Sequence, residues 1–459
     1  MYVQQPRGRQ NHTMPRSRSA LATAALMAVA ALSLSGVAAA APSYPPPKNP
    51  LKPSAKPKGP FQTHTVCAKG CMHKTIQEAV NDAKAGDTIK VSAGVYKERI
   101  VIKGPNKRSI KIIGDPKHPE KVVLEGKGSK PLTVPNNAVS INGSDNIVVN
   151  GLTAQGYNGY GFFVINNNGY TFTNLIAKND GVYGMYAFNS VGGEMSNSTA
   201  AWNNDSGFYI GQTPPQTKPI RSYIKNVVAY GNVLGYSGTN SRYVTITKSK
   251  WFNNGLGIVP NALDSEKYAP FEDNVITDND VFFNNWNYFA AAPFKLRAGA
   301  TGEIAYPVGT GILLFGGRRT DVTKNRIYGN YLMGVGAVQQ ILLKQVDARN
   351  LEGNKIHDNV FGNGGKNKNG RDIFYDGDGK DNCIGPNVGV EVTVPAATSF
   401  MPCPFTGANT FDSAAQGEAV SWAIDTTEPA HEKFWIKNTQ VPVPGVTPLE
   451  HWTKAIGVK

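Results

Sequence analysis

The 459-residue sequence contains only four cysteines and seven histidines, and no apolar run after residue 40 is long enough to cross a membrane. No two histidines have a metal-binding spacing such as His-x-x-x-His. The leucine ladder of leucine-rich repeats, the period of collagen and the heptads of coiled coils are also missing. These absences argue against a membrane-embedded domain, a histidine-based metal centre and several familiar repeat folds.

A different repeat is present. The pattern Asn-x-apolar-x-x-Asn occurs at residues 174–179, 279–284, 325–330 and 354–359. A second mark is a glycine that opens a short apolar run. If Asn287 is taken to fill one position, these marks fall at Gly161, Gly184, Gly207, Gly235, Gly257, Asn287, Gly311 and Gly334. The intervals between successive marks are 23, 23, 28, 22, 30, 24 and 23 residues.

A unit of 22 or 23 residues with two or three β-rich runs is too short to bury its own apolar face, so it must stack on copies of itself. The pattern therefore predicts an all-β fold, a single-stranded right-handed parallel β-helix. Asparagine tolerates left-handed backbone geometry and its amide can bond along a stack, so the paired asparagines are expected at corners.

The solenoid is expected to begin with a capping helix. Thr75 and Glu78 have the spacing of a capping box, an apolar stripe runs from Ile76 to Ala83, and Gly86 is expected to end the helix. Such a helix would close the open end of the first coil, as terminal repeats must.

The segments Gln77-Glu78-Ala79-Val80 and Gly94-Val95-Tyr96-Lys97-Glu98 resemble the opening of pectin-lyase-like β-helix proteins, which include pectate lyases, pectin methylesterases and polygalacturonases. The repeats also resemble the right-handed β-helix repeat proteins of actinobacteria. The resemblance covers about residues 67–387 and implies the fold. Tyr96 and Glu98 lie in the cap and are expected to be structural. The catalytic signatures of the best-known relatives are absent, so the reaction is left open.

The regions on either side of the repeats have other compositions. Residues 1–40 have the layout of a secretory signal peptide that ends in Ala38-Ala39-Ala40, and residues 41–60 form a linker rich in proline and lysine. The β-helix is expected over residues 61–387 and a C-terminal segment, packed on or after it, over residues 388–459. We expect a secreted protein, with cell-wall association through the linker as an alternative.

Net charge adds little about partners. The chain carries +14, but without four leader arginines and four linker lysines the folded part carries about +6. This slightly favours acidic glycans, and the absence of a clustered basic helix argues against nucleic acid. We expect a monomer without a membrane span.

Three long segments interrupt the repeats, at residues 211–221, 261–272 and 292–309. They are expected to share one phase, to stack along one edge and to wall a groove for an extended polymer. The candidate catalytic residues are Asp264, Glu266, Lys267, Lys295 and Arg297. The candidate substrate-binding residues are Lys218, Arg221, Tyr268, Trp286 and Tyr288.

Two chemistries fit these residues. A lyase acting on a uronate needs a base and a group that neutralises the carboxylate, which the lysines, Arg297 and Tyr268 would supply. A glycoside hydrolase needs two carboxylates, and Asp264, Glu266 and Asp273 are the candidates. We favour a lyase acting on an extended acidic polysaccharide, and the alternative is a non-catalytic solenoid that binds carbohydrate or cell wall.

The cysteines and one acidic cluster complete the prediction. Of three possible pairings, the local ones, Cys67 with Cys71 and Cys383 with Cys403, are favoured. Three aspartates alternate with glycine in the segment FYDGDGKDNC. We favour a solvated turn before Cys383. The alternative is a calcium site with Asp376, Asp378 and Asp381 as ligands, and calcium is the one cofactor that the sequence suggests.

Overall fold

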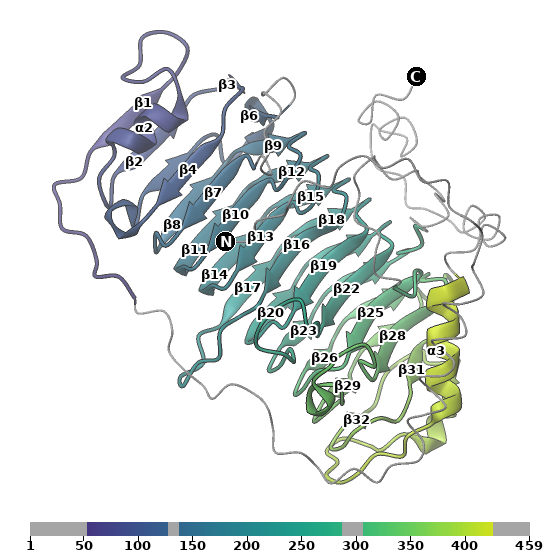
Figure 1. The fold of residues 1–459 in the computed structure, drawn as a ribbon. Helices are drawn as coiled ribbons and strands as arrows, with labels where there is room; N and C mark the ends of the chain where they lie inside the picture. The colour runs from purple at the N-terminus through teal and green to yellow at the C-terminus, as the bar shows by residue number, and fades with distance from the viewer. Residues whose placement is uncertain (1–52, 127–136, 287–305, 426–459) are drawn as a thin grey trace, which may run out of the picture. The chain divides into compact units, whose positions relative to one another are not determined.

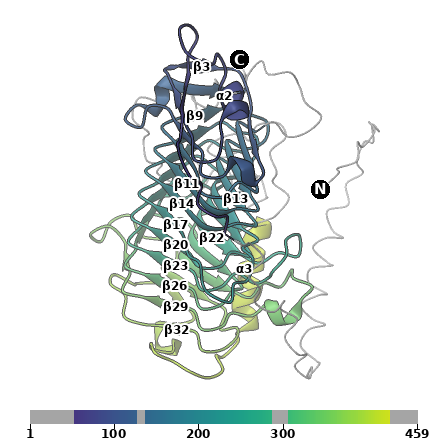
Figure 2. The ribbon, with the colours of Figure 1, turned by 90° about the vertical axis from the view of Figure 1, so that its left-hand side faces the viewer.

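The computed structural model describes residues 53–126, 137–286 and 306–425 of the chain. The predicted signal peptide and the first part of the predicted linker lie outside these ranges, as do Tyr288, Lys295 and Arg297. In the described residues the chain winds through three sheets in turn, A, B and C, and every pairing between their strands is parallel (Figures 1 and 2). The expected β-helix is therefore confirmed.

The strands are short, as a coil of this length requires. Sheet A contains β1 Thr63–Val66, β2 Thr88–Val91, β5 Lys111–Ile113, β8 Ile147–Asn150, β11 Asn168–Thr173, β14 Val191–Ser196, β17 Ser222–Lys225, β20 Val244–Thr247, β23 Val275–Thr277, β26 Asp321–Thr323, β29 Lys355–His357 and β32 Cys383–Ile384. Sheet B contains β3 Gly94–Tyr96, β6 Val122–Glu125, β9 Thr153–Gln155, β12 Ile176–Lys178, β15 Thr199–Ala201, β18 Val228–Tyr230, β21 Lys250–Phe252, β24 Asp280–Phe282, β27 Arg326–Tyr328 and β30 Val360–Phe361.

Sheet C contains β4 Ile100–Lys103, β7 Val139–Asn142, β10 Phe162–Ile165, β13 Met185–Phe188, β16 Ser206–Gly211, β19 Leu234–Thr239, β22 Leu256–Asn261, β25 Thr310–Phe315, β28 Met333–Val338, β31 Ile373–Tyr375 and β33 Thr393–Val394. The helices are α2 Ile76–Asp82 and α3 Ser413–Asp425, and the 3-10 turns are η1 Pro105–Lys107, η2 Pro119–Lys121, η3 Val346–Ala348 and η4 Ala397–Ser399.

One apolar core fills the interior of the coils. Alternate residues of each strand point inward, as in Phe162, Phe208 and Trp251, and they form a continuous cluster from Val66 to Tyr375. Because each coil contacts its neighbours, this shared core stabilises units that would not fold alone.

The N-terminal cap agrees with the sequence in most respects. The Thr75 hydroxyl accepts from the Glu78 N–H at 3.2 Å, and the Glu78 carboxylate accepts from the Thr75 N–H at 3.1 Å. Glu98 also caps α2, because its two oxygens accept from the N–H groups of Ile76 and Gln77. The expected end at Gly86 was wrong: α2 ends at Asp82, and Ala83 caps it in an extended conformation.

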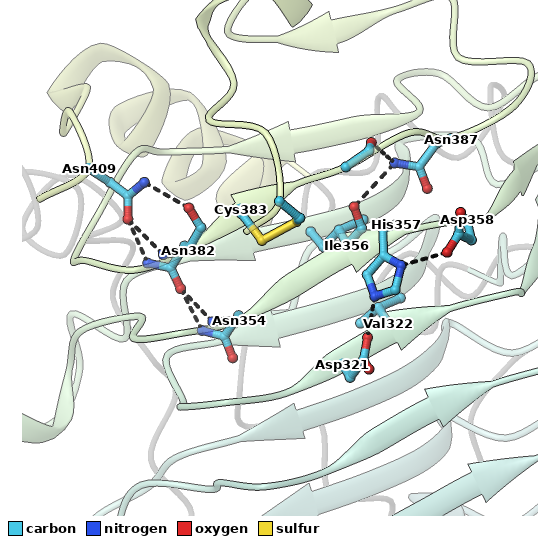
Figure 3. The surroundings of a disulfide bond; sticks show 12 residues. Asp321, Val322, Asn354, Ile356, His357, Asp358, Asn382, Cys383, Asn387 and Asn409 are labelled. Atoms are coloured by element: carbon cyan, nitrogen blue, oxygen red, sulfur yellow. Dashed lines mark hydrogen bonds and ion pairs between the residues drawn. A yellow bond between two sulfur atoms is a disulfide. The ribbon is translucent and has the colours of Figure 1, made fainter. Parts of the chain in front are cut away.

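Buried asparagines form ladders at the corners. One runs through Asn203, Asn232, Asn254, Asn284, Asn330 and Asn369, whose amides bond from coil to coil at 3.0–3.1 Å. Figure 3 shows part of another ladder, in which Asn354 donates to Asn382 and Asn382 to Asn409. The repeated asparagines do mark corners. They mark more than one corner, however, because the segment 354–359 flanks a strand of sheet A and the other three flank strands of sheet B.

The coil count differs from the prediction. Strand β22 pairs directly with β25, with Ile258 opposite Ile312, so no strand of sheet C lies between them. The coil expected between Gly257 and Gly311 is therefore absent from sheet C, and Asn287 itself lies outside the described residues.

Both disulfides are present, Cys67 with Cys71 and Cys383 with Cys403, and they are the two expected pairs. Beyond the last strand of sheet A, β33 pairs with β31, and α3 lies beside β28 and β31 (Figure 1). A hydrogen bond from Gln416 to Gln339 and an ion pair between Arg371 and Glu418 hold this helix.

The end of the linker lies against the solenoid. The Ser54 N–H donates to Asp145 at 2.8 Å, and Arg108 donates to the Ala55 carbonyl at 2.6 Å. The expected free spacer thus joins the fold at its last residues. Within the described residues no helix combines the length and apolar character that a membrane crossing needs.

Candidate functional site

The outer face of sheet C changes character along the stack. From β22 onward its outward positions include covered apolar side chains, such as Val259, Leu313 and Phe374, which are at most 1 % exposed. Toward the N-terminus the outward positions of β10, β13 and β16 carry aromatic rings instead. The two regions meet at β19, where Ser237 lies between Tyr209 and Val259 in the outward column.

Four tyrosines and a phenylalanine gather on this aromatic part, which we call the tyrosine cluster: Tyr160, Phe163, Tyr183, Tyr186 and Tyr209. The parallel register places Phe163 beside Tyr186 and Tyr186 beside Tyr209 on successive coils. Neighbouring ring centroids lie 4.7–5.5 Å apart, within the range of favourable aromatic pairs.

A carboxyl group reaches the cluster from a loop two coils away. The Tyr209 hydroxyl donates a hydrogen bond to Glu266 Oε1, and Glu266 follows β22 in the segment 262–272. The other carboxyl oxygen of Glu266 is buried and has no hydrogen-bond partner among the described residues. A carboxylate in this position would lack the solvation that its charge requires.

The surroundings favour the neutral form of Glu266. Burial raises its pKa to about 8, although the hydrogen bonds from Tyr209 and from the Gln212 backbone oppose the rise. A carboxyl with this pKa is mostly protonated at pH 7, so it can donate a hydrogen bond through its hydroxyl.

The tyrosines are held in their neutral form as well. Burial raises the pKa of Tyr183, Tyr186 and Tyr209 well above its usual value, and the nearby charge of Glu266 adds to the rise. These phenols are therefore hydrogen-bond and proton donors rather than bases.

Asp205 is a second carboxyl beside the cluster. It directly precedes β16, and its Oδ1 accepts from the Ser206 hydroxyl at 3.0 Å. Its charge raises the pKa of Tyr160, Tyr183 and Tyr306, which the charge of Glu266 also raises. The same tyrosines thus lie within the electrostatic reach of both carboxyl groups.

The expected stacking of the long segments is partly correct. The segments 212–221 and 262–272 both lead from sheet C to sheet A, and they touch: the Lys267 N–H donates to Gln212 Oε1 at 2.9 Å. A third segment at this corner, 339–354, was not expected, and its Lys344 N–H donates to Asp264. The third expected segment, 292–309, falls in the connection from β24 of sheet B to β25 of sheet C, and its residues 292–305 lie outside the described residues.

Of the candidate catalytic residues that the structure describes, Glu266 alone is seen to contact the cluster. Asp264 is exposed and accepts from the Lys344 N–H at 2.7 Å. Lys267 is also exposed, and its backbone is bonded to Gln212 and Asn240. Lys295 and Arg297 lie outside the described residues.

The four candidate substrate-binding residues that the structure describes do not come together. Lys218 is exposed on its loop, and Arg221 turns toward sheet A, where it donates to Thr245 at 3.1 Å. Trp286 is fully buried in the apolar cluster that covers the later strands of sheet C, so its ring is closed to a sugar in this structure. Tyr268 bonds Arg242 through its carbonyl, and Tyr288 lies outside the described residues.

The other acidic candidates at this corner are engaged in ion pairs. Arg319 pairs with Asp273 and Glu272 at 2.7 and 2.8 Å, and Arg242 pairs with Glu272 at 2.7 Å. Asp273, a carboxylate considered for hydrolysis, is thus paired with a guanidinium.

The aspartates proposed as calcium ligands are surrounded by N–H donors. Asp376 accepts from the N–H groups of Gln339 and Asp378, and Asp378 accepts from Gln339 Nε2 and the Leu351 N–H. Asp381 accepts from the Gly407 N–H. No group of three or more His, Cys, Asp or Glu side chains in the described part of the chain is arranged to hold a metal ion.

Sequence reasoning missed the tyrosines and Asp205, although the sequence contains a signal for the tyrosines. Tyr160 and Tyr183 are 23 residues apart, and so are Phe163, Tyr186 and Tyr209 in turn. Aromatic residues at the period of the repeat must fall in columns on one face.

No protein-family model matches this chain. No curated protein sequence matches it either. Among solved structures, the A-module of the Azotobacter vinelandii mannuronan C-5 epimerase AlgE6 matches with 15% identity over 69% of this chain and 89% of that chain, at a TM-score of 0.46. The periplasmic alginate epimerase AlgG matches with 13% identity over 66% and 72%, at a TM-score of 0.43. The pectate lyase Pel9A matches with 15% identity over 72% and 78%, at a TM-score of 0.38. The activities named are those of these proteins, and what this chain is similar to in them is the parallel β-helix.

Proposed function

We propose that this protein acts on an extended acidic polysaccharide at the tyrosine cluster, by a reaction that begins with removal of the proton beside a uronate carboxylate. The supporting observation is Glu266, a buried carboxyl that is kept neutral among phenols. Neutral donors of this kind are suited to stabilising charge that develops on a bound carboxylate.

The chemistry of a uronate explains why such donors are useful. When the proton on the carbon next to the carboxylate leaves, its electron pair is shared with the carboxylate, whose negative charge increases. Protonated Glu266 and the phenols of Tyr183 and Tyr186 would donate hydrogen bonds to those oxygens. Because these donors are already oriented and largely dry, the stabilisation costs little reorganisation.

We assign Asp205 as the base. The phenols are too weakly acidic to be ionised at neutral pH, and Glu266 is mostly protonated. Asp205 is the other carboxyl group whose charge acts on the same tyrosines. In a lyase reaction the C5 proton passes to Asp205. The C5 electron pair then forms the C4–C5 double bond, the bond from C4 to its oxygen breaks, and that oxygen takes a proton from a phenol. The chain is cleaved with one unsaturated end.

Hydrolysis is the second candidate, and one observation favours it. Glu266 and Asp205 are two carboxyl groups in the electrostatic range of the same tyrosines, one of them with a raised pKa. A glycoside hydrolase uses such a pair as acid and base or nucleophile. Elimination remains our preferred reaction because phenols surround the acid, and they would serve a developing carboxylate charge.

A location outside the cytoplasm would suit a polysaccharide substrate. Two disulfides are typical of a protein outside the cytoplasm, where extended polysaccharides are found. Export by the predicted signal peptide and attachment to a cell wall are part of this proposal.

A panel of uronic acid polymers incubated in deuterated water tests the function. Elimination gives unsaturated ends that absorb ultraviolet light, hydrolysis gives reducing ends without unsaturation, and reversible proton removal gives deuterium in uncleaved chains. We expect unsaturated ends, which Asp205→Asn should abolish. Binding without any of these products would support the non-catalytic solenoid, and a protein that neither binds nor changes any polymer would refute the proposal.

A further inference from the structure

The loop that carries Glu266 is held by two side chains from neighbouring coils. Gln212 is the first residue after β16, and Asn240 is the first residue after β19. Both have left-handed backbone geometry, with φ of 45° and 50°, which turns the chain sharply out of sheet C. Their side chains meet the segment 263–267 rather than the strand ends alone.

Asn240 makes the larger set of contacts. Its Nδ2 donates to the carbonyls of Leu263, Glu266 and Lys267 at 2.9, 2.9 and 3.1 Å, and its Oδ1 accepts from the Leu263 N–H at 3.2 Å. The residue is fully buried. A single amide therefore satisfies both ends of the turn that presents Glu266, in a place where an unmade hydrogen bond would be costly.

Gln212 holds the same turn from the preceding coil. Its Oε1 accepts at 2.9 Å from the N–H of Lys267, the residue that directly follows Glu266. Its backbone N–H lowers the pKa of the Glu266 carboxyl. Gln212 lies only three residues beyond Tyr209, so the residue that holds the loop and the phenol that bonds Glu266 belong to one short stretch.

The corner asparagines of the ladders have a different role. Asn279 donates to the carbonyls of Ile246 and Thr277 and to Asn325 Oδ1, all of them in strand ends or in the ladder itself. Its contacts stabilise the stack of coils. Asn240 instead donates to three carbonyls of a loop whose other function is to carry an acid.

We propose that Asn240 and Gln212 are positioning residues, which hold the turn 263–267 so that the Glu266 carboxyl stays buried against Tyr209. The catalytic consequence rests on the proposed function, whereas the geometric consequence does not. Without either side chain the turn can move away from sheet C, and the Glu266 carboxyl gains access to water. Since burial is the main cause of the raised pKa of Glu266, that pKa must then fall toward its ordinary value of 4.5.

The experiment compares four variants with the wild-type chain. Asn240→Ser removes most contacts of the amide, and Gln212→Asn keeps a side chain that tolerates the left-handed backbone but is too short to reach Lys267. Gln212→Glu retains an acceptor at full reach and serves as the first control. Asn279→Ser is the second control, because it removes a buried asparagine whose amide also donates to three acceptors, at a corner away from the loop.

The primary measurement is the titration of Glu266, followed through carbon-13 in labelled glutamate side chains. Asn240→Ser and Gln212→Asn should lower its pKa by at least one, and both controls should leave it near or above the wild-type value. Where Asn240→Ser does not fold, Gln212→Asn carries the same test. An unchanged pKa in Gln212→Asn, or an equal fall in Asn279→Ser, would overturn the proposal.

Activity on the uronic acid polymers separates the catalytic consequence of the proposal from the geometric one. If the proposed function holds, Gln212→Asn should lower kcat about tenfold with little change in KM, because the acid is misplaced while the rest of the surface is intact. If no polymer is a substrate, the function fails, and the titration still decides whether the two residues hold Glu266.

Discussion

The Tyr209 hydroxyl donates a hydrogen bond to the carboxyl of Glu266, a residue 57 positions away in the sequence. Parallel stacking makes this contact possible, because β16 and β22 are separated by one strand, β19, and the loop after β22 folds back toward the earlier coil. Without the stack, neither side chain would have a reason to be buried. Four predictions follow from this contact and from the acids that the fold buries elsewhere.

Substitutions of Glu266 should separate hydrogen-bond donation from proton transfer. Glu266→Gln keeps an oxygen for Tyr209 and gains an amide that can donate to a carboxylate, so its kcat should stay within about tenfold of wild type. Glu266→Ala loses both and should lower kcat by about 10²–10³-fold, as removal of a preorganised donor does. If Glu266→Gln is as inactive as Glu266→Ala, Glu266 transfers a proton and hydrolysis becomes the better assignment.

The pH dependence of kcat should report the same carboxyl. Glu266 must be protonated to donate, and burial raises its pKa to about 8. Activity should therefore decline as the pH rises through about 8, approaching tenfold per pH unit above that value. Initial rates on one polymer between pH 6 and 10 measure this decline. The Glu266→Gln variant should not show the decline. Wild-type activity that increases through pH 8 would contradict the role of protonated Glu266.

Removal of one hydroxyl tests the Tyr209 contact. Tyr209→Phe keeps the ring but removes the side-chain donor to Glu266, so we expect a loss of about 1 kcal/mol in unfolding free energy and a lower kcat. The matched control is Tyr328→Phe, since Tyr328 stacks on Phe282 in sheet B at 4.9 Å, away from the cluster. Chemical denaturation and kinetics on both variants make the comparison. Equal effects of the two substitutions would mean that the contact has no special role.

The contribution of Asp376 and Asp378 to stability should fall as the pH rises from about 4 to 7. Burial raises the pKa of Asp376 to about 6 and that of Asp378 to about 7, where the charge of Asp376 adds to the effect. The native state then binds more protons than the unfolded state between pH 4 and 7, so stability is greatest below that window and is lost through it. Each group contributes a slope of about 1 kcal/mol per pH unit.

Asp378→Asn removes one of these titrating groups, so its unfolding free energy should depend less steeply on pH between 5 and 7. Denaturant titrations at several pH values give the slope for both proteins. A mutant with the wild-type slope would show that Asp378 does not titrate in this range.

The fold was predictable because its determinants are local and repeated. The capping box of Thr75 and Glu78, the inward apolar residues and the asparagine corners each depend on a few neighbouring residues, and the structure contains them all. The phase of individual coils was harder to predict. Asparagine serves several corners, so Asn287 resembled the mark of an extra coil, although β22 pairs directly with β25.

The site was less predictable for a different physical reason. A half-buried strand shows its outward face by alternation, but β16 is buried on both faces, so Tyr209 resembled a core residue. Glu266 was among the candidates because its loop interrupts the repeat. Its partners came from strands two coils earlier, and only the three-dimensional register places them together.

The titration of Glu266 in the wild-type chain tests the central claim most directly. Spectra of carbon-13-labelled glutamate are compared between the wild-type protein and Glu266→Gln, so that the signal missing from the variant identifies the residue. A signal that titrates near pH 8 is the predicted result. A missing signal that titrates near 4.5 would show a solvated surface carboxylate, and the tyrosine cluster would then lose the neutral acid on which the proposed reaction depends.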